Sequence, residues 1–412
     1  MARSVVIVGG GVVGAFTAYS LAGAGWGVTV LDRGTLGGGC SAGNCGYVCP
    51  SHVLPLAAPG ALASTLKTLL TRNSPLKVRP GFALRNLGWF LRFARRCNRT
   101  DMLHAALGIQ ALLNSSRRLY DTLLENEGLN VEWDMHGLLF AFHTAKAFEH
   151  YVEVNHLLGE RFAMPAERYD ADEMLELEPS LKPDVAVGGY LYKSDAQLRP
   201  DVLMAQMRKV LERMGVAIVE GCTITGIAGQ GTAKAVQTTR GEFAADAFVF
   251  ATGAWTPQLA KALGGRVPII PGKGYSITVP RPAICPTYPM IFEEHRVAVS
   301  PFQSGLRIGS TMEFAGYETS MNPKRLQLLR DAAAFYLRDP GLGGPEEPWW
   351  GWRPMTPDGN PVIDHSPKFA NVVVAAGHGM LGLSMAPGTG RLVKEMLGGE
   401  PPHVDAGAYS WR

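Results

Sequence analysis

The chain has 412 residues, of which 46% are hydrophobic, and its formal net charge is +3. This length predicts two domains, and the small net charge excludes a generally basic surface for nucleic acid. The six cysteines include no CxxC pair and no zinc-ligand spacing, which predicts reduced thiols in a cytoplasmic protein without a metal site. The apolar run at the N-terminus is interrupted by a glycine loop, so we do not expect a signal peptide, and no run approaches the about 20 apolar residues of a transmembrane helix.

The segment Ser4–Asp32 has the pattern of a dinucleotide-binding βαβ unit. The β-branched run Val5–Val8 precedes GxGxxG, a helix and a second strand that ends at Asp32. Glycines at these positions allow a tight turn, a close approach of the backbone to a pyrophosphate, and close packing of the helix on the strand. An acid at the end of the second strand accepts hydrogen bonds from a ribose. This pattern fits NAD or FAD, and the expected contacts are Gly9, Gly11, Val12, Val13, Gly14, Asp32 and Arg33.

Residues Gly34–Pro50 are rich in glycine and other small residues, where an NAD-binding domain usually continues with regular βα units. The βαβ unit followed by SAGNCGYVCPSHVLPLAAPG resembles the D-amino-acid oxidase superfamily of FAD-dependent oxidoreductases. Within it, the chain is most similar to bacterial D-amino-acid dehydrogenases and hydroxyproline dehydrogenases. The resemblance implies FAD as cofactor, and for Cys45 and Cys49 simple packing is the alternative to a redox role. The implied flavin contacts are Ser41, Asn44, Cys45 and Gly46.

The segment from Arg33 to Thr100 contains no Asp or Glu and carries a charge of +10. Within it, Phe82–Arg96 mixes bulky apolar residues and arginines at near-helical spacing. This pattern predicts a helix on an anionic membrane surface, or one packed on its own domain with a solvated basic face. The resemblance implies electron delivery to a membrane quinone pool, which favours the membrane. The basic residues are Arg33, Lys67, Arg72, Lys77, Arg79, Arg85, Arg92, Arg95, Arg96 and Arg99.

Hydrophobic periodicity predicts the later elements. Helices are expected at about 102–127, 145–159, 169–179, 322–338 and from 200 onward. Strands are expected at 137–142, 188–192, 216–219, 223–227, 233–239, 243–251, 268–279, 297–301, 306–314 and 372–376. The strand at 243–251 ends in ATGAW, a turn that the superfamily places beside the flavin, so Thr252, Gly253 and Trp255 are cofactor candidates.

These elements predict a Rossmann-like α/β FAD-binding domain built from discontinuous segments and an α+β substrate domain with a mainly antiparallel sheet. We assign residues 1–60, 188–262 and 350–412 to the FAD-binding domain. Residues 61–187 and 263–349 form the substrate domain.

A second stretch of resemblance, WRPMTPDGNPVI, contains the GxRP-type arginine with which the superfamily binds a substrate carboxylate. Here that residue is Arg353. Its guanidinium suits bidentate carboxylate recognition, and the alternative is a cation–π contact with Trp350 or Trp352. A tyrosine that some family oxidases carry near 297–301 has no evident counterpart. Relatives with covalent flavin have a cysteine where this chain has Gly351, which predicts non-covalent FAD.

The residues after the strand at 372–376 open a helix that runs to Leu397. Its positive end would face the flavin pyrimidine ring, where negative charge collects on reduction. His378 is a candidate for contact with flavin or substrate, or is held by backbone hydrogen bonds. His52 and Tyr275 are further candidates for the substrate cavity. The cofactor candidates in this region are Gly377, Gly379, Leu381, Gly382, Leu383 and Ser384.

The expected reaction is oxidation of a D-amino acid by hydride transfer from its α-carbon to flavin N5. Water then hydrolyses the imine to a 2-oxo acid and ammonia, and the electrons pass to a quinone or another acceptor. The handedness and the amine come from the resemblance. Alternatives are a secondary amino acid such as D-proline, hydroxy-D-proline or a sarcosine-like substrate, an oxidase that uses oxygen, and a non-catalytic FAD-binding subunit of an electron-transfer complex. The expected location is the cytoplasm, or the inner face of the cell membrane.

Overall fold

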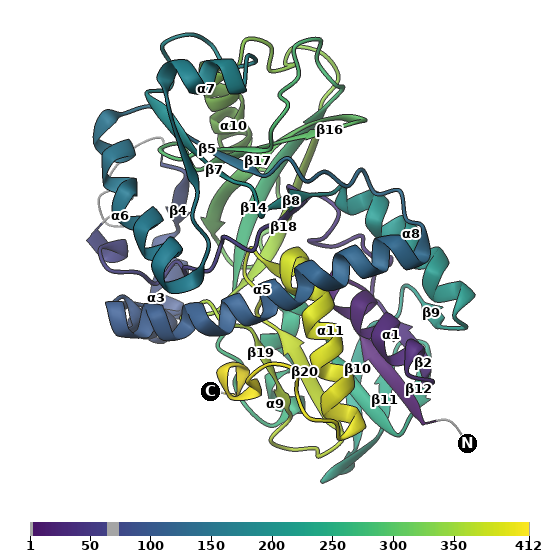
Figure 1. The fold of residues 1–412 in the computed structure, drawn as a ribbon. Coiled ribbons are helices and arrows are strands. Elements are labelled where there is room, and N and C mark those ends of the chain that lie inside the picture. The colour runs from purple at the N-terminus through teal and green to yellow at the C-terminus, as the bar shows by residue number, and fades with distance from the viewer. Residues whose placement is uncertain (1–2, 64–73, 412) are drawn as a thin grey trace.

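The computed structural model describes residues 3–63 and 74–411, in which two large sheets lie one above the other and helices pack around them (Figure 1). The six-stranded sheet has the order β19-β20-β13-β1-β2-β9, and its strands are parallel except β19. Buried β-branched runs, such as that of β1, suit a parallel sheet that is covered on both faces. The strands are β1 (Ser4–Val8), β2 (Gly27–Leu31), β9 (Ala217–Val219), β13 (Ala247–Phe250), β19 (Val362–His365) and β20 (Val372–Ala376).

Helices from opposite ends of the chain cover one face of this sheet. In Figure 1, α1 (Val12–Gly23), drawn in purple, lies beside α11 (Gly382–Gly398), drawn in yellow. The helix α5 (Arg99–Glu127) packs on α11, and α8 (Pro200–Arg213) packs on α1. The two terminal helices approach so closely that a Cβ at Gly390 would lie 2.5 Å from the carbonyl oxygen of Phe16.

A small antiparallel sheet covers the opposite face. It consists of β10 (Ile224–Gln230), β11 (Thr232–Thr238) and β12 (Gly241–Ala244). The prediction of one strand at 243–251 is wrong, because β12 and β13 belong to different sheets. The chain turns between them at Asp246, whose carboxylate accepts hydrogen bonds from the backbone nitrogen and the hydroxyl of Ser4, at 2.7 and 2.8 Å.

The nine-stranded sheet has the order β18-β14-β17-β16-β15-β5-β7-β6, with β4 paired to β17. It is mainly antiparallel, and the pairs β15–β5 and β17–β4 are parallel. The helix α10 (Pro323–Tyr336) packs on β14, β16 and β17, which covers one face. The strands are β4 (Leu76–Val78), β5 (Leu138–Phe142), β6 (Glu167–Asp170), β7 (Gly188–Tyr192), β14 (Ile270–Val279), β15 (Met290–Phe292), β16 (Val297–Phe302), β17 (Gly305–Phe314) and β18 (Glu347–Met355).

The helix predicted at 82–96 is divided at Asn86, whose backbone leaves the helical region. It forms α3 (Pro80–Arg85) and α4 (Leu87–Arg96). The helix predicted at 169–179 begins only after β6. The remaining elements are α6 (Ala145–Phe162), α7 (Ala171–Leu177), α9 (Ala260–Leu263), the strands β3 (Tyr47–Val48) and β8 (Ala196–Gln197), and the 3₁₀ helices η1 (Gly253–Leu259) and η2 (Ala406–Tyr409).

The predicted fold class is confirmed, since a parallel α/β sheet is joined to a mainly antiparallel sheet with helices. Two predicted domain boundaries do not follow the sheets. The strand β7, at the start of segment 188–262, and most of β18, in segment 350–412, pair within the nine-stranded sheet. The long helix α5, which the sequence analysis assigns to the substrate domain, packs against α11, a helix that covers the six-stranded sheet. The division into two domains stays a prediction.

Candidate active site

A cavity of about 1820 Å³ lies between the two large sheets. The carboxyl ends of β1 and β2 border it from one side, and β17 and β18 border it from the other. Such an edge of a parallel sheet is the usual place for a ligand. The predicted site residues that line the cavity are Gly9, Gly11, Val12, Val13, Asp32, Arg33, Ser41, Asn44, Cys45, His52, Thr252, Gly253, Trp255, Tyr275, Arg353, His378, Gly379, Leu381, Gly382, Leu383 and Ser384.

Three predicted glycines do not line this cavity and serve close packing instead. A Cβ at Gly14 would lie 1.8 Å from the carbonyl oxygen of Gly9. A Cβ at Gly46 would lie 1.9 Å from the carbonyl oxygen of Leu198, and one at Gly377 would lie 2.7 Å from a methyl carbon of Thr356. These glycines therefore allow close packing around the cavity, and their contact with a cofactor stays a prediction.

The βαβ unit has the geometry of a dinucleotide site. Gly9 has a φ of +110°, and a Cβ there would lie 2.4 Å from the carbonyl oxygen of Ala251. The two carboxylate oxygens of Asp32 accept hydrogen bonds from the backbone nitrogens of Gly10 and Gly34, both at 2.7 Å. A carboxylate has about four acceptor sites, so Asp32 is oriented and can still accept from a ribose hydroxyl.

The segment from Ser41 to Cys45 is fastened to the nine-stranded sheet by residues that the sequence analysis missed. The Ser276 hydroxyl donates to the carbonyl oxygen of Gly43 at 3.0 Å, and Ser300 donates to that of Cys45 at 2.5 Å. The buried Arg307 donates to the carbonyl oxygens of Ala42 and Asn44, at 2.9 and 2.7 Å. A serine or arginine in a strand carries no sequence signal for such a contact.

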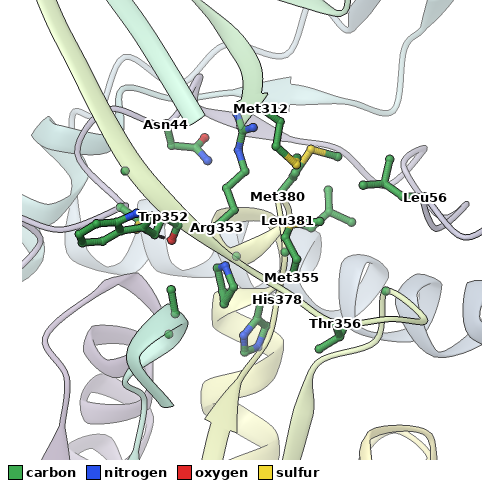
Figure 2. A pocket seen from close by; sticks show the side chains of 18 of the residues that line it. Asn44, Leu56, Met312, Trp352, Arg353, Met355, Thr356, His378, Met380 and Leu381 are labelled. Atoms are coloured by element: carbon green, nitrogen blue, oxygen red, sulfur yellow. Dashed lines mark hydrogen bonds between the residues drawn. The ribbon is translucent and has the colours of Figure 1, made fainter. Parts of the chain in front are cut away.

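Arg353 on β18 points its guanidinium into the cavity, with Met312 and Met355 nearby (Figure 2). Its Nη1 donates to the carbonyl oxygens of Thr311 and Ser310, at 3.2 and 3.4 Å. Among the described residues no carboxylate pairs with this guanidinium, and burial lowers its pKa from the usual range. The alternative of a tryptophan contact is not favoured, because the cation over Trp350 is Lys273, at 4.3 Å, and among the described residues no cation lies over Trp352.

The position of this guanidinium depends on two local features. A Cβ at Gly274 would lie 2.6 Å from Cζ of Arg353, so a glycine is required beneath it. The register of β14 with β17 shifts between Gly274 and Ser276. At this point of β17, Ser310 has a φ of +104°. This β-bulge supplies the carbonyl groups of Ser310 and Thr311 to which Arg353 donates.

His378 and Tyr275 border the cavity but have other partners. The Nε2 of His378 lies 3.0 Å from the hydroxyl oxygen of Thr389, and burial lowers the pKa of the imidazole to about 3. Tyr275 donates its phenol hydrogen to Glu313 at 2.9 Å and belongs to the core that includes α10. This geometry does not favour direct contact of the Tyr275 phenol with a ligand.

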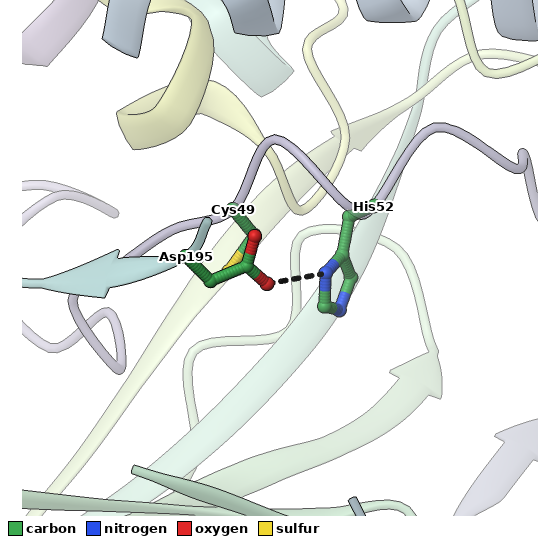
Figure 3. Close-up of side chains that lie close together, drawn as sticks. All are labelled: Cys49, His52 and Asp195. Atoms are coloured by element: carbon green, nitrogen blue, oxygen red, sulfur yellow. Dashed lines mark ion pairs between the residues drawn. The ribbon is translucent and has the colours of Figure 1, made fainter. Parts of the chain in front are cut away.

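His52 belongs to a group with Cys49 and Asp195 (Figure 3). The carboxylate of Asp195 accepts from the hydroxyl and the backbone nitrogen of Ser51, at 2.5 and 3.0 Å, and lies 4.0 Å from Nδ1 of His52. Burial raises the pKa of Asp195 to about 7 and lowers that of His52 to about 4. Although these residue types can ligate a metal, burial raises the pKa of the Cys49 thiol, which favours a hydrogen-bonded wall. The absence of a metal site stays a prediction.

Comparisons with known proteins agree with this geometry. The model of the family described as DAO, FAD dependent oxidoreductase, matches residues 4–396. A D-amino acid dehydrogenase of Xanthobacter autotrophicus is 33% identical, with 98% of each chain covered. One of Agrobacterium fabrum is 32% identical, with 98% of this chain and 97% of that protein covered. The fold is similar to that of glycine oxidase from Geobacillus kaustophilus, with a TM-score of 0.79, 23% identity and coverage of 100% and 99%.

The fold and the cavity are those of an FAD-dependent oxidoreductase. The chain belongs to the DAO family of FAD-dependent oxidoreductases, which confirms the resemblance and the cofactor predicted from the sequence. The residues present fit FAD, because the glycine turn, the start of α1 and Asp32 line the same large cavity as Arg353. The individual cofactor contacts stay predictions.

We expect the FAD to be bound without a covalent bond. Gly351 occupies the position at which a cysteine would tether the flavin, and a Cβ there would lie 2.3 Å from the ring of Trp349. Acid precipitation of the purified protein should therefore release the yellow colour into the supernatant. Colour retained in a washed pellet would contradict this prediction.

Proposed function

We propose that this protein is a dehydrogenase that oxidises a D-amino acid to an imine, which water hydrolyses to a 2-oxo acid and ammonia. The main support is Arg353, a half-buried cation that faces the cavity and has only carbonyl partners among the described residues. Burial of a charge is costly unless it is paired, so a substrate carboxylate would complete this site. The names of the relatives support the D configuration.

In this proposal the chain mainly supplies binding and orientation. Arg353 binds the carboxylate through two parallel hydrogen bonds, and Gly274 and the bulge at Ser310 hold the guanidinium in place. The bound FAD would supply the acceptor for the hydride from the α-carbon. The first turn of α11, at Gly382 and Leu383, directs its positive end to the cavity and stabilises negative charge that develops there.

Anaerobic flavin reduction tests this function directly. The purified protein is mixed with D-, L- and cyclic amino acids, and bleaching of the flavin is followed by absorbance. We expect D-amino acids with a primary amine to bleach it and their L-enantiomers to leave it oxidised. Bleaching only by proline-like substrates would favour the secondary-amine alternative, and no bleaching by any amino acid would contradict the proposal.

We further propose that the electrons pass to a quinone at an anionic membrane surface, which α3 and α4 contact. Leu84, Leu87 and Leu91 are 75%, 53% and 56% exposed, and the arginines of α4 follow Leu91 within the next five residues. Exposed leucines with arginines suit a helix at a lipid surface. Lys67 and Arg72 of the basic segment lie outside the described residues. No helix of the described part has the length and apolar character needed to cross a membrane, so such a contact would be peripheral.

The membrane contact predicts salt-sensitive co-sedimentation with anionic vesicles. Each basic residue near such a surface contributes about 1 kcal/mol, and this decays over a Debye length of about 8 Å at physiological salt. Changing Leu84, Leu87 and Leu91 together to Ser should abolish pelleting at low salt. The control Leu107→Ser removes a leucine of α5 that is 59% exposed and should pellet as the unchanged protein does. If the unchanged protein stays in the supernatant at low salt, α4 is a solvated helix of its own domain.

A further inference from the structure

We infer that the part of the cavity farthest from Arg353 along the nine-stranded sheet binds a large apolar side chain of the substrate. This inference rests on the proposed function and deepens it by naming the substrate class. We call this part the far lobe, and define it by its lining residues Ala298, Ile291, Phe140, Tyr151, Val154 and Leu158.

The floor of the far lobe is one registered row of the sheet. Gly309 of β17 pairs with Ala298, which pairs with Ile291, which pairs with Phe140. Side chains paired across adjacent strands share a face, and three steps between strands span roughly 14 Å. The row begins beside the segment that the family places along the flavin, because a Cβ at Gly309 would lie 2.7 Å from Sγ of Cys45. The floor thus leads away from the reaction site and offers only apolar side chains.

The opposite wall is the apolar face of α6. Ala147, Tyr151, Val154 and Leu158 follow one another at spacings of four, three and four residues, which places them on one side of a helix. All four line the cavity, and the ring of Tyr151 stacks on that of Phe140 with centroids 5.7 Å apart. Wall and floor together form an aromatic and aliphatic sleeve.

Charged and phenolic groups at the end of the sleeve have protein partners, and Glu294 there accepts from the backbone nitrogens of His143 and Thr144, at 3.0 and 2.9 Å. The phenol oxygens of Tyr151 and Tyr192 lie 2.9 Å apart, and Glu293 pairs with Arg296 at 2.7 Å. Because these groups already have partners, a charged group at the end of the substrate side chain would form few additional hydrogen bonds or ion pairs here. The far lobe therefore favours aromatic or branched aliphatic side chains over cationic ones.

The test first compares kcat/KM between substrates and then introduces larger side chains that fill the far lobe. A methylene group in an apolar pocket changes kcat/KM roughly tenfold or more, so D-leucine and D-phenylalanine should exceed D-alanine by at least about 100-fold. Val154→Trp should lower kcat/KM for D-phenylalanine at least about tenfold and leave D-alanine within about twofold. Ala298→Val, a smaller change in the floor, should act in the same direction with less risk to folding.

The matched control is Val152→Trp, which adds the same ring to α6 at a position that is 42% exposed. This variant should leave kcat/KM unchanged for both D-alanine and D-phenylalanine. Flavin content and melting temperature are measured to show that each variant is folded. Equal kcat/KM for D-alanine and D-phenylalanine, or an equal loss of both in Val154→Trp, would overturn the inference. So would a variant in which anaerobic flavin reduction is normal and only dye reduction is slow, because the lobe would then serve the electron acceptor. Failure of every amino acid to reduce the flavin would instead refute the proposed function.

Discussion

Replacing Arg353 by methionine is expected to lower kcat/KM for D-amino acids by about 10²–10⁴ while FAD stays bound. Two charge-assisted hydrogen bonds, each worth about 1.5–3 kcal/mol, are lost from the carboxylate. Together they amount to roughly 3–6 kcal/mol, and 1.36 kcal/mol corresponds to one decade in rate. Methionine keeps the unbranched, apolar stem, so the packing beside Met312 and Met355 changes little.

Arg353→Lys should recover only a small part of this loss. An ammonium keeps the charge but lacks the planar fork that fixes the carboxylate and so aims the α-hydrogen. The control is Arg240→Met, because Arg240 is exposed and is not among the residues that line the cavity. Flavin content, melting temperature and steady-state kinetics are measured on the same preparation. A stable, flavin-loaded Arg353→Met protein with near-normal kcat/KM would rule out the carboxylate role.

The sequence carries most of the information on the cofactor site. The glycines and Asp32 are recognisable from the sequence because each function requires a particular residue type at a fixed spacing. A close approach of the backbone requires glycine, and the acceptor at the end of the second strand requires a carboxylate. The same holds for Arg353, whose position follows from the resemblance of WRPMTPDGNPVI. The structure brings these separate segments to one cavity.

Features that depend on strand pairing could not be predicted in this way. Arg307 holds the segment at Ala42 and Asn44 from a strand that lies more than 260 residues away, at sequence separations of 265 and 263. The bulge at Ser310 and the row from Gly309 to Phe140 exist only once the register is set. The sequence does not reveal that β7 and β18 pair within the nine-stranded sheet, because composition does not show which sheet a strand joins.

Gly14→Ala is expected to destabilise the protein by about 1–3 kcal/mol or more and to release FAD. A Cβ at this position would lie 1.8 Å from the carbonyl oxygen of Gly9, which is backbone and cannot rotate away. The contact can be relieved only by moving α1 away from β1, at the cost usual for overpacking. The same shift moves the start of α1 relative to Gly9 and Gly11, which line the cofactor cavity.

Gly23→Ala, in the same helix, provides the matched control. Around Gly23 the nearest heavy atom is Cε of Met214, at 3.8 Å from the added Cβ, which is an ordinary contact. Alanine is the better helix former by up to about 1 kcal/mol, so this variant should keep FAD and melt at the same or a higher temperature. The two variants add the same methyl group to one helix, and the difference between them isolates the approach of α1 to Gly9. If Gly14→Ala retained stoichiometric FAD and the melting temperature of Gly23→Ala, the glycine turn would not be the element that holds the cofactor.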